Sequence, residues 1–306
     1  MPSWPARKGI STVTGGFKPA LTGPDLSPWR EELEAAGEKP DDAFPFRTAL
    51  VCFLAALSGR DKNAADAAHA VWGDWGQAVE ARVKTLHAAG AGDDVQTLLA
   101  GLKYAFFEDY RFAMLAPAGT LVAAPDLIEG LKNREMTPLD AAVLVYGAGR
   151  SRGWPVAPAD FPGRPLLVFA GENARIFADP AHHFRPLDAG ELRSFVKEQA
   201  GAEAELSQDY YRTLNARETA IRYGNALKTA LLQQGATPRA YACVRAMQFL
   251  APGEYRLNYD AALLAAQLGQ RDAALEALQA YRTRAPNARE VQEMEHLVHS
   301  FLARNA

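Results

Sequence analysis

Apolar side chains recur at three- and four-residue steps along most of the chain, which is the spacing of one face of an α-helix. In residues 46–58 this stripe carries Leu50, Phe53, Leu54 and Leu57. Gly59 follows directly and is a typical helix stop. The same pattern predicts further helices over residues 64–89, 93–108, 125–133 and 138–150, and it returns from about residue 187 almost to the C-terminal end. We therefore expect a predominantly helical protein.

Two short apolar runs interrupt the helical pattern. Residues 166–169 read LLVF and residues 175–177 read RIF, with Gly171, Glu172 and Asn173 between them. Short β-rich runs on either side of turn residues are typical of a hairpin or of adjacent strands. The predicted fold class is therefore α+β and predominantly helical, with one small sheet.

Residues 1–43 are interrupted by six prolines and five glycines, which argues against regular structure over most of this arm. Ser27 followed by Pro28 is typical of a helix start, so a short helix is expected over residues 27–36. Trp4, Phe17 and Trp29 are the side chains that would hold the arm against the body. A partly mobile tail is the alternative.

The C-terminal third contains an internal repeat of 34 residues. Proline, glycine and alanine each recur at this spacing, in the pairs Pro252 and Pro286, Gly235 and Gly269, and Ala240 and Ala274. Thirty-four residues is the period of the tetratricopeptide repeat, a helix–turn–helix unit that stacks into a binding surface. We expect two such units, with a capping helix over residues 287–302.

The first helix of each unit, over residues 222–233 and 256–268, is expected to line a groove. The side chains that would face it are Arg222, Asn225, Thr229, Arg256, Tyr259 and Leu263. Arginines, an amide and a tyrosine on one face suit an acidic or C-terminal peptide. The alternative is that this face packs on the preceding domain, because two repeats alone are too few to be stable.

Composition and charge exclude several classes of protein. The chain has 306 residues, with 33 Lys and Arg against 36 Asp and Glu, and no long basic stripe, so we expect no nucleic-acid partner. The longest apolar run, residues 49–57, is too short to cross a bilayer, and the first residues show no signal-peptide pattern. Cys52 and Cys243 lie among apolar helical residues and are expected to be buried thiols of a cytoplasmic protein.

No cofactor or metal is expected. The sequence lacks both glycine-rich nucleotide motifs, G-x-G-x-x-G and G-x-x-x-x-G-K-S/T. Adjacent His182 and His183 are expected to lie on the surface. His296 and His299 stand three apart on the last helix, where zinc would need a third ligand from elsewhere.

Several stretches together resemble the SirB-like family. Residues 136–180 contain TPLDAAVLVYGAGRSRGWP, then FPGRPLLVF, then ARIFADP, and residues 222–228 read RYGNALK. The order and spacing of these stretches carry the resemblance. It implies a transglutaminase-like domain over residues 44–213, followed by tetratricopeptide-type repeats over residues 214–306.

The resemblance also implies a Cys–His–Asp triad, and this chain departs from it. The helix start that would hold the cysteine has Asp140, and the position after Phe-Pro-Gly has Arg164 in place of histidine. Arginine stays protonated and cannot act as a general base. Asp179 alone matches the triad carboxylate. Arg164 is expected either to form a structural ion pair with Asp179 or to hold a ligand carboxylate in the former cleft.

These observations favour a pseudoenzyme: a non-catalytic protein- or peptide-binding module with a helical-repeat platform. One alternative is a hydrolase or amide-bond enzyme that uses a non-standard site at Asp140, Arg164 and Asp179. Another is a structural subunit of a complex, with the proline-rich arm wrapped around its partner.

Overall fold

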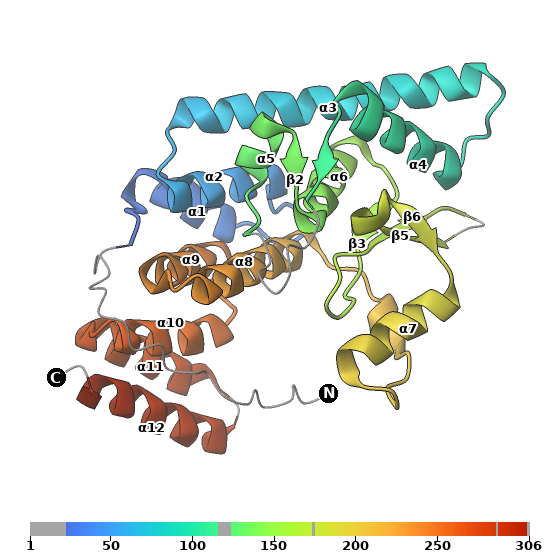
Figure 1. Ribbon diagram of the computed structural model, residues 1–306. Coiled ribbons are helices and arrows are strands. Elements are labelled where there is room, and N and C mark those ends of the chain that lie inside the picture. The colour runs from blue at the N-terminus through green and yellow to red at the C-terminus, as the bar shows by residue number, and fades with distance from the viewer. Residues whose placement is uncertain (1–22, 116–123, 173–174, 286, 305–306) are drawn as a thin grey trace.

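The computed structural model describes residues 23–115, 124–172, 175–285 and 287–304 (Figure 1). The helices are α1 (Arg30–Gly37), α2 (Phe46–Ser58), α3 (Lys62–Ala88), α4 (Val95–Lys103), α5 (Leu127–Asn133), α6 (Pro138–Arg152), α7 (Ala189–Ala200), α8 (Ala216–Gln233), α9 (Thr237–Leu250), α10 (Arg256–Gln267), α11 (Arg271–Arg284) and α12 (Ala288–Arg304). The strands are β1 (Ala113–Met114), β2 (Glu135–Met136), β3 (Val156–Pro158), β4 (Leu167–Ala170), β5 (Arg175–Asp179) and β6 (Arg185–Leu187).

Helix α2 lies at the centre of the N-terminal half, and every residue from 49 to 57 is buried. The long helix α3 crosses over it (Figure 1) and contributes Trp72 and Trp75, both fully buried. Gly147 of α6 lets this layer close, because a Cβ there would stand 2.3 Å from the Trp72 ring. The third predicted helix divides in two: α4 ends at Lys103 and the chain continues as a π-helical turn over Tyr104–Asp109.

The small sheet is an antiparallel meander in the order β3, β4, β5, β6. Successive side chains along each strand point to opposite faces of the sheet. Leu167 and Phe169 of β4 join the main core, whereas Val168 points into a second core beneath α7. The expected strand pair is therefore present, extended by one strand on each side, and the α+β, predominantly helical class is confirmed.

The repeats fold as the 34-residue spacing predicted. Helices α8 and α9 form one antiparallel pair and α10 and α11 the next, and α12 packs on both helices of the second pair. Gly235 and Gly269 close the two turns at φ 72° and 71°, in the left-handed region that glycine adopts without strain. Ala240 and Ala274 are fully buried at the helix crossings.

The described part of the N-terminal arm packs into the body. A 3-10 turn over Ser27–Trp29 leads into α1 and buries Trp29, whose indole Nε1 donates to the Arg60 carbonyl at 3.2 Å. Helix α1 lies against α9, and a Cβ on Gly37 would stand 1.9 Å from the Phe249 carbonyl oxygen. Trp4 and Phe17 lie outside the described residues.

Helix α8 belongs to both halves of the protein. Toward the repeats it pairs with α9, and toward the N-terminal half it buries Tyr223. The Tyr223 hydroxyl donates to Asp140 Oδ1 at 2.6 Å and accepts from the Leu127 amide at 3.0 Å. A single side chain thus joins the starts of α5 and α6 to the first repeat helix.

Replacing Tyr223 by phenylalanine should lower the free energy of unfolding by about 1–3 kcal/mol, because a buried amide and a buried carboxylate each lose a partner. Urea denaturation of the full chain measures the change. Tyr241→Phe is the matched control, since this half-buried α9 hydroxyl has no hydrogen bond among the described residues. Equal losses in the two variants would contradict the assigned role.

Candidate functional site

Asp140, at the position where the family resemblance implies a cysteine, is enclosed by the protein. It is the third residue of α6, and its Oδ2 accepts from the Thr137 amide at 3.1 Å and the Thr137 hydroxyl at 2.6 Å. The Thr137 hydroxyl in turn accepts from the Asp140 amide, which completes a capping box. With Tyr223 on Oδ1, the carboxylate is only 2% exposed.

Burial raises the pKa of Asp140 from 3.8 to about 6, and the hydrogen bonds from Thr137 and Tyr223 only partly oppose this shift. The Asp140 carboxylate therefore caps the start of α6, although burial disfavours its ionised form. Its surroundings leave no space from which a substrate could approach it.

Asp179, at the end of β5, is fully buried and has three partners. Its Oδ2 lies 3.5 Å from Arg164 Nη1 and 2.7 Å from His182 Nδ1, and its Oδ1 accepts from the Ala181 amide at 2.9 Å. Arg164 also reaches Glu198 at 3.2 Å and stacks on the Phe195 ring at 3.6 Å. The ion pair expected between Arg164 and Asp179 is therefore present.

His182 is the residue here that sequence reasoning undervalued. Its side chain is 57% exposed, in line with a surface position, yet its ring is bound to the buried Asp179 carboxylate. The signal was available in the sequence: Asp179 precedes Pro180, and an aspartate that caps a turn can reach the side chain three residues on. The structure thus holds a His–Asp pair without a thiol beside it.

Asp140, Arg164 and Asp179 do not form one constellation. The hydrogen-bond partners of Asp140 are Thr137 and Tyr223, whereas Asp179 binds Arg164 and His182. In the described part of the chain, no hydrogen bond or ion pair connects Asp140 to the other two.

Neither cysteine is placed for chemistry. Burial raises the pKa of Cys52 to about 11 and that of Cys243 to about 12, and the Cys243 thiol donates to the Gly224 carbonyl at 3.3 Å. A thiolate is needed for nucleophilic attack, and neither group provides one near neutral pH. Within the described residues, no three histidine, cysteine or carboxylate side chains gather closely enough to bind a metal ion.

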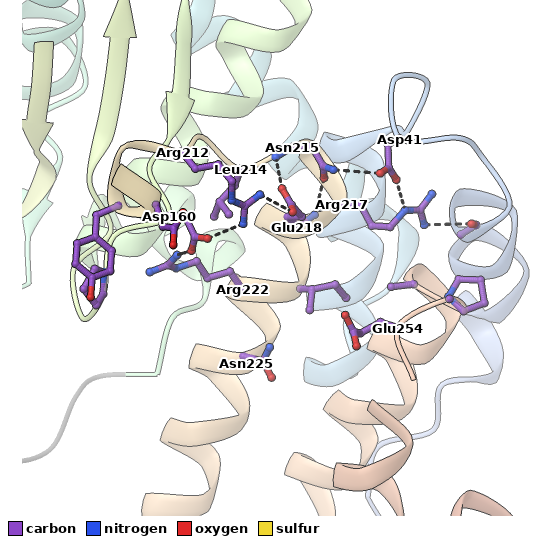
Figure 2. A pocket seen from close by; sticks show the side chains of 18 of the residues that line it. Asp41, Asp160, Arg212, Leu214, Asn215, Arg217, Glu218, Arg222, Asn225 and Glu254 are labelled. Carbon is purple, nitrogen blue, oxygen red and sulfur yellow. Dashed lines mark hydrogen bonds and ion pairs between the residues drawn. The ribbon is translucent and has the colours of Figure 1, made fainter. Parts of the chain in front are cut away.

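A cleft of about 1010 Å³ opens where the sheet region meets α8 (Figure 2). One wall comes from Asp160 and the loop before β4, another from the first half of α8, and a third from the turn between α9 and α10. The end of α1 contributes Gly37 and the following loop contributes Asp41. The cleft is therefore built from segments far apart in the sequence.

Three arginines of the cleft are all paired within the protein. Arg212 binds Asp160 at 2.5 Å and Glu218 at 2.7 Å, and Arg222 binds Asp160 at 2.7 Å and the Phe161 carbonyl. Arg217 binds Asp41 at 2.7 Å and lies over the Phe44 ring. Figure 2 shows the ion pairs of these arginines with Asp160, Glu218 and Asp41. They fasten α8 to the segments before it.

The predicted groove residues have separate fates. Arg222 is docked on the N-terminal domain, which is the alternative that the sequence left open for this face. Asn225 lines the cleft with its amide unpaired among the described residues (Figure 2), and its carbonyl accepts from the Thr229 hydroxyl at 2.9 Å. Arg256 is exposed and without an ion pair in the described chain. Tyr259 packs edge-on against the Tyr281 ring at 5.7 Å, and Leu263 packs on the core.

Comparison with known proteins agrees with this architecture. Residues 73–225, half of the chain, match the transglutaminase-like superfamily, and residues 227–299 match the tetratricopeptide repeat. The chain belongs to the transglutaminase-like superfamily. The expected order, a transglutaminase-like domain followed by tetratricopeptide repeats, is thereby confirmed. The two matches meet within α8, the helix that the structure shares between both halves.

Two relatives, both called UPF0162 protein, come from the Temecula1 and 9a5c strains of Xylella fastidiosa. Each is 28% identical over 206 residues, which cover 64% of this chain and 73% of the relative. No solved structure gives a significant match. No helix in the described ranges has both the length and the apolar character needed to span a membrane.

The raised pKa of Asp140 predicts a pH-dependent difference in stability. The folded state holds this proton up to about pH 6 and the unfolded state only to about pH 4, so the free energy of unfolding falls as pH rises through that window. Compared with Asp140→Asn, the wild type should lose roughly 2 kcal/mol between pH 4 and pH 7.

Chemical denaturation of both proteins at several pH values measures this difference. The other carboxylates are the same in both proteins, so their contributions to the pH dependence cancel in the comparison. Asp140→Asn therefore serves as the control. A stability difference that stays constant from pH 4 to pH 7 would refute the assignment.

Proposed function

We propose that this protein is a non-catalytic protein- or peptide-binding module, in which a transglutaminase-like domain without triad chemistry supports a helical-repeat platform. The observation that carries the proposal is the 1010 Å³ cleft beside α8, whose lining includes Arg222 and Asn225 of the first repeat helix, because stacked helical repeats commonly bind partners on such a surface. Tetratricopeptide repeats typically mediate protein interactions.

The former triad positions support a role without catalysis. A cysteine-type acyl transfer needs a thiolate and a base that can accept its proton. An arginine, the residue at position 164, cannot serve as such a base, Asp140 is enclosed, and both thiols are buried. Two buried, unpaired cysteines also suit a reducing compartment, so we place the protein in the cytoplasm.

The enzyme alternative at Asp140, Arg164 and Asp179 finds less support. Its acid–base candidate Asp140 has a pKa near 6, which suits proton transfer, but its oxygens are taken by Thr137 and Tyr223. A general acid or base must lie within hydrogen-bond reach of the substrate, and a carboxylate that is 2% exposed does not.

The binding face that we propose follows the first helices of the two repeats. Among the described residues, Asn225 offers an amide without a hydrogen bond inside the cleft, and Arg256 offers a guanidinium without an ion pair at the start of α10, 5.7 Å from the centre of the Tyr255 ring. Thr229, Tyr259 and Leu263 continue the same face, while Arg222 fixes its upper end to the N-terminal domain.

An acidic group on the partner would bind Arg256 rather than the cleft itself. Five carboxylates and three paired guanidinium groups line the cleft: Asp41, Asp160, Asp209, Glu218 and Glu254, and Arg212, Arg217 and Arg222. This balance favours a polar or basic segment inside the cleft. We therefore infer a peptide with an acidic residue at the α10 end and uncharged or basic residues in the cleft.

Selection from a random-peptide display library against the full chain tests the proposal. Arg256→Ala should weaken the selected peptides about five- to tenfold, roughly 1 kcal/mol, because an exposed charge pair is lost. Asn225→Ala should weaken them as well. Fluorescence anisotropy with labelled peptides measures both effects.

Arg271→Ala is the matched control, since Arg271 is an exposed arginine on α11, the second helix of its repeat. Equal effects of Arg256→Ala and Arg271→Ala would overturn the binding face. Turnover of peptides or esters that is abolished in Asp140→Ala would instead establish the enzyme alternative.

A further inference from the structure

A second cavity, of about 410 Å³, lies on the other side of the N-terminal half, between the start of α2, the first third of α3 and the last turns of α6. Its polar lining consists of Arg47 and Thr48 from α2, His69 from α3, and Arg150 and Ser151 from α6. None of its lining residues is acidic. The cavity thus gathers two guanidinium groups and an imidazole without a counter-charge.

Arg47 is the residue of this cavity whose burial costs free energy, because no carboxylate offsets its charge among the described residues. It is half-buried over the Trp72 ring at 5.3 Å, and its Nη2 donates to the His69 carbonyl at 2.9 Å. Its Nε is buried and has no hydrogen-bond partner, and no carboxylate of the described chain lies within ion-pair distance. Burial, and then the nearby Arg152, lower the pKa of Arg47. Arg217 and Arg222, also recessed, each have an aspartate.

Arg150 and His69 complete the positive wall. Arg150 is exposed. Its Nη2 donates to the Asp42 carbonyl at 3.0 Å and its guanidinium also hydrogen-bonds the Tyr146 hydroxyl, but no carboxylate forms an ion pair with it in the described residues. Burial, followed by the charge of Arg47, lowers the pKa of His69, and Asp66 opposes this shift weakly. A bound anion would reverse the effect and make the imidazole a charged donor.

The first turn of α2 adds backbone donors to the same cavity. This 13-residue helix starts after Pro45 without a side-chain cap. The amides of Arg47 and Thr48 have no backbone acceptor among the described residues, whereas those of Phe46 and Ala49 do. Unpaired first-turn amides and the positive end of a helix favour an anion, and here they lie beside two arginines.

We propose that this pocket is an oxyanion site that binds inorganic phosphate or the phosphoryl group of a small molecule. The guanidinium of Arg47 lines the cavity from α2, Arg150 supplies a second charge from α6, and the first-turn amides of Arg47 and Thr48 belong to residues that line the same cavity. Such a site would also staple α2 to α6, because the two arginines come from different helices. It is separate from the repeat face and does not rest on the proposed function.

Isothermal titration of the full chain with inorganic phosphate, at constant ionic strength, tests the site. We expect saturable binding of one equivalent, at least tenfold weaker in Arg150→Ala and undetectable in Arg47→Met, whose side chain still covers the Trp72 ring. Arg193→Ala, an exposed arginine on α7, is the control and should bind as the wild type does. A phosphomonoester that binds more tightly than phosphate would indicate a metabolite; equal affinity would indicate the free ion.

The His69 proton signals provide a second readout that does not depend on how well Arg47→Met folds. Phosphate should raise the pKa of His69 in the wild type, and this rise should be smaller in Arg150→Ala. An unmoved His69 pKa, or equal phosphate affinity in wild type and Arg150→Ala, would overturn the proposal. Binding heat that rises with phosphate concentration without saturating would also overturn it, because a defined site saturates and a general salt effect does not.

Discussion

The hydrogen bond between Tyr223 and Asp140 connects the two halves of this protein, and much of the architecture depends on it. Helix α8 presents Tyr223 to the starts of α5 and α6, and the same helix pairs with α9 through its opposite side. A two-unit repeat needs support from a neighbour, because each unit buries only part of its apolar surface alone. The shared helix provides that support, and the arginines on its first turns reinforce it.

The same hydrogen bond accounts for the structural role of Asp140 at the start of α6. In a cysteine-type active site, the first turn of a helix lends its positive end to a thiolate. Here Asp140 uses that position for a capping box with Thr137 and for the anchor to Tyr223. Both oxygens of the Asp140 carboxylate accept hydrogen bonds from within the protein, so the group is not available to a substrate. Asp140 is therefore part of the junction between the two halves.

The charged contacts of the protein fall into two groups that differ in what they imply. Arg164, Arg217 and Arg222 are recessed, and each has a carboxylate, so their cost of desolvation is offset inside the chain. Arg47 is recessed without one. This contrast, rather than the presence of basic side chains as such, distinguishes the two sites. The small cavity by α2 suggests a ligand, whereas the paired arginines of the large cleft hold α8 against the segments before it.

The sequence by itself determined the helices and the two repeats, because these follow from local periodicity and fixed spacing. Gly235 and Gly269 show how directly spacing predicts a turn. Only the tertiary structure decided that Arg222 docks on Asp160 and that Arg47 and Arg150 share a cavity. The physical reason is that an ion pair depends on which side chains the packed core brings within a few ångströms, and no local pattern records distances between residues 60 or 100 positions apart.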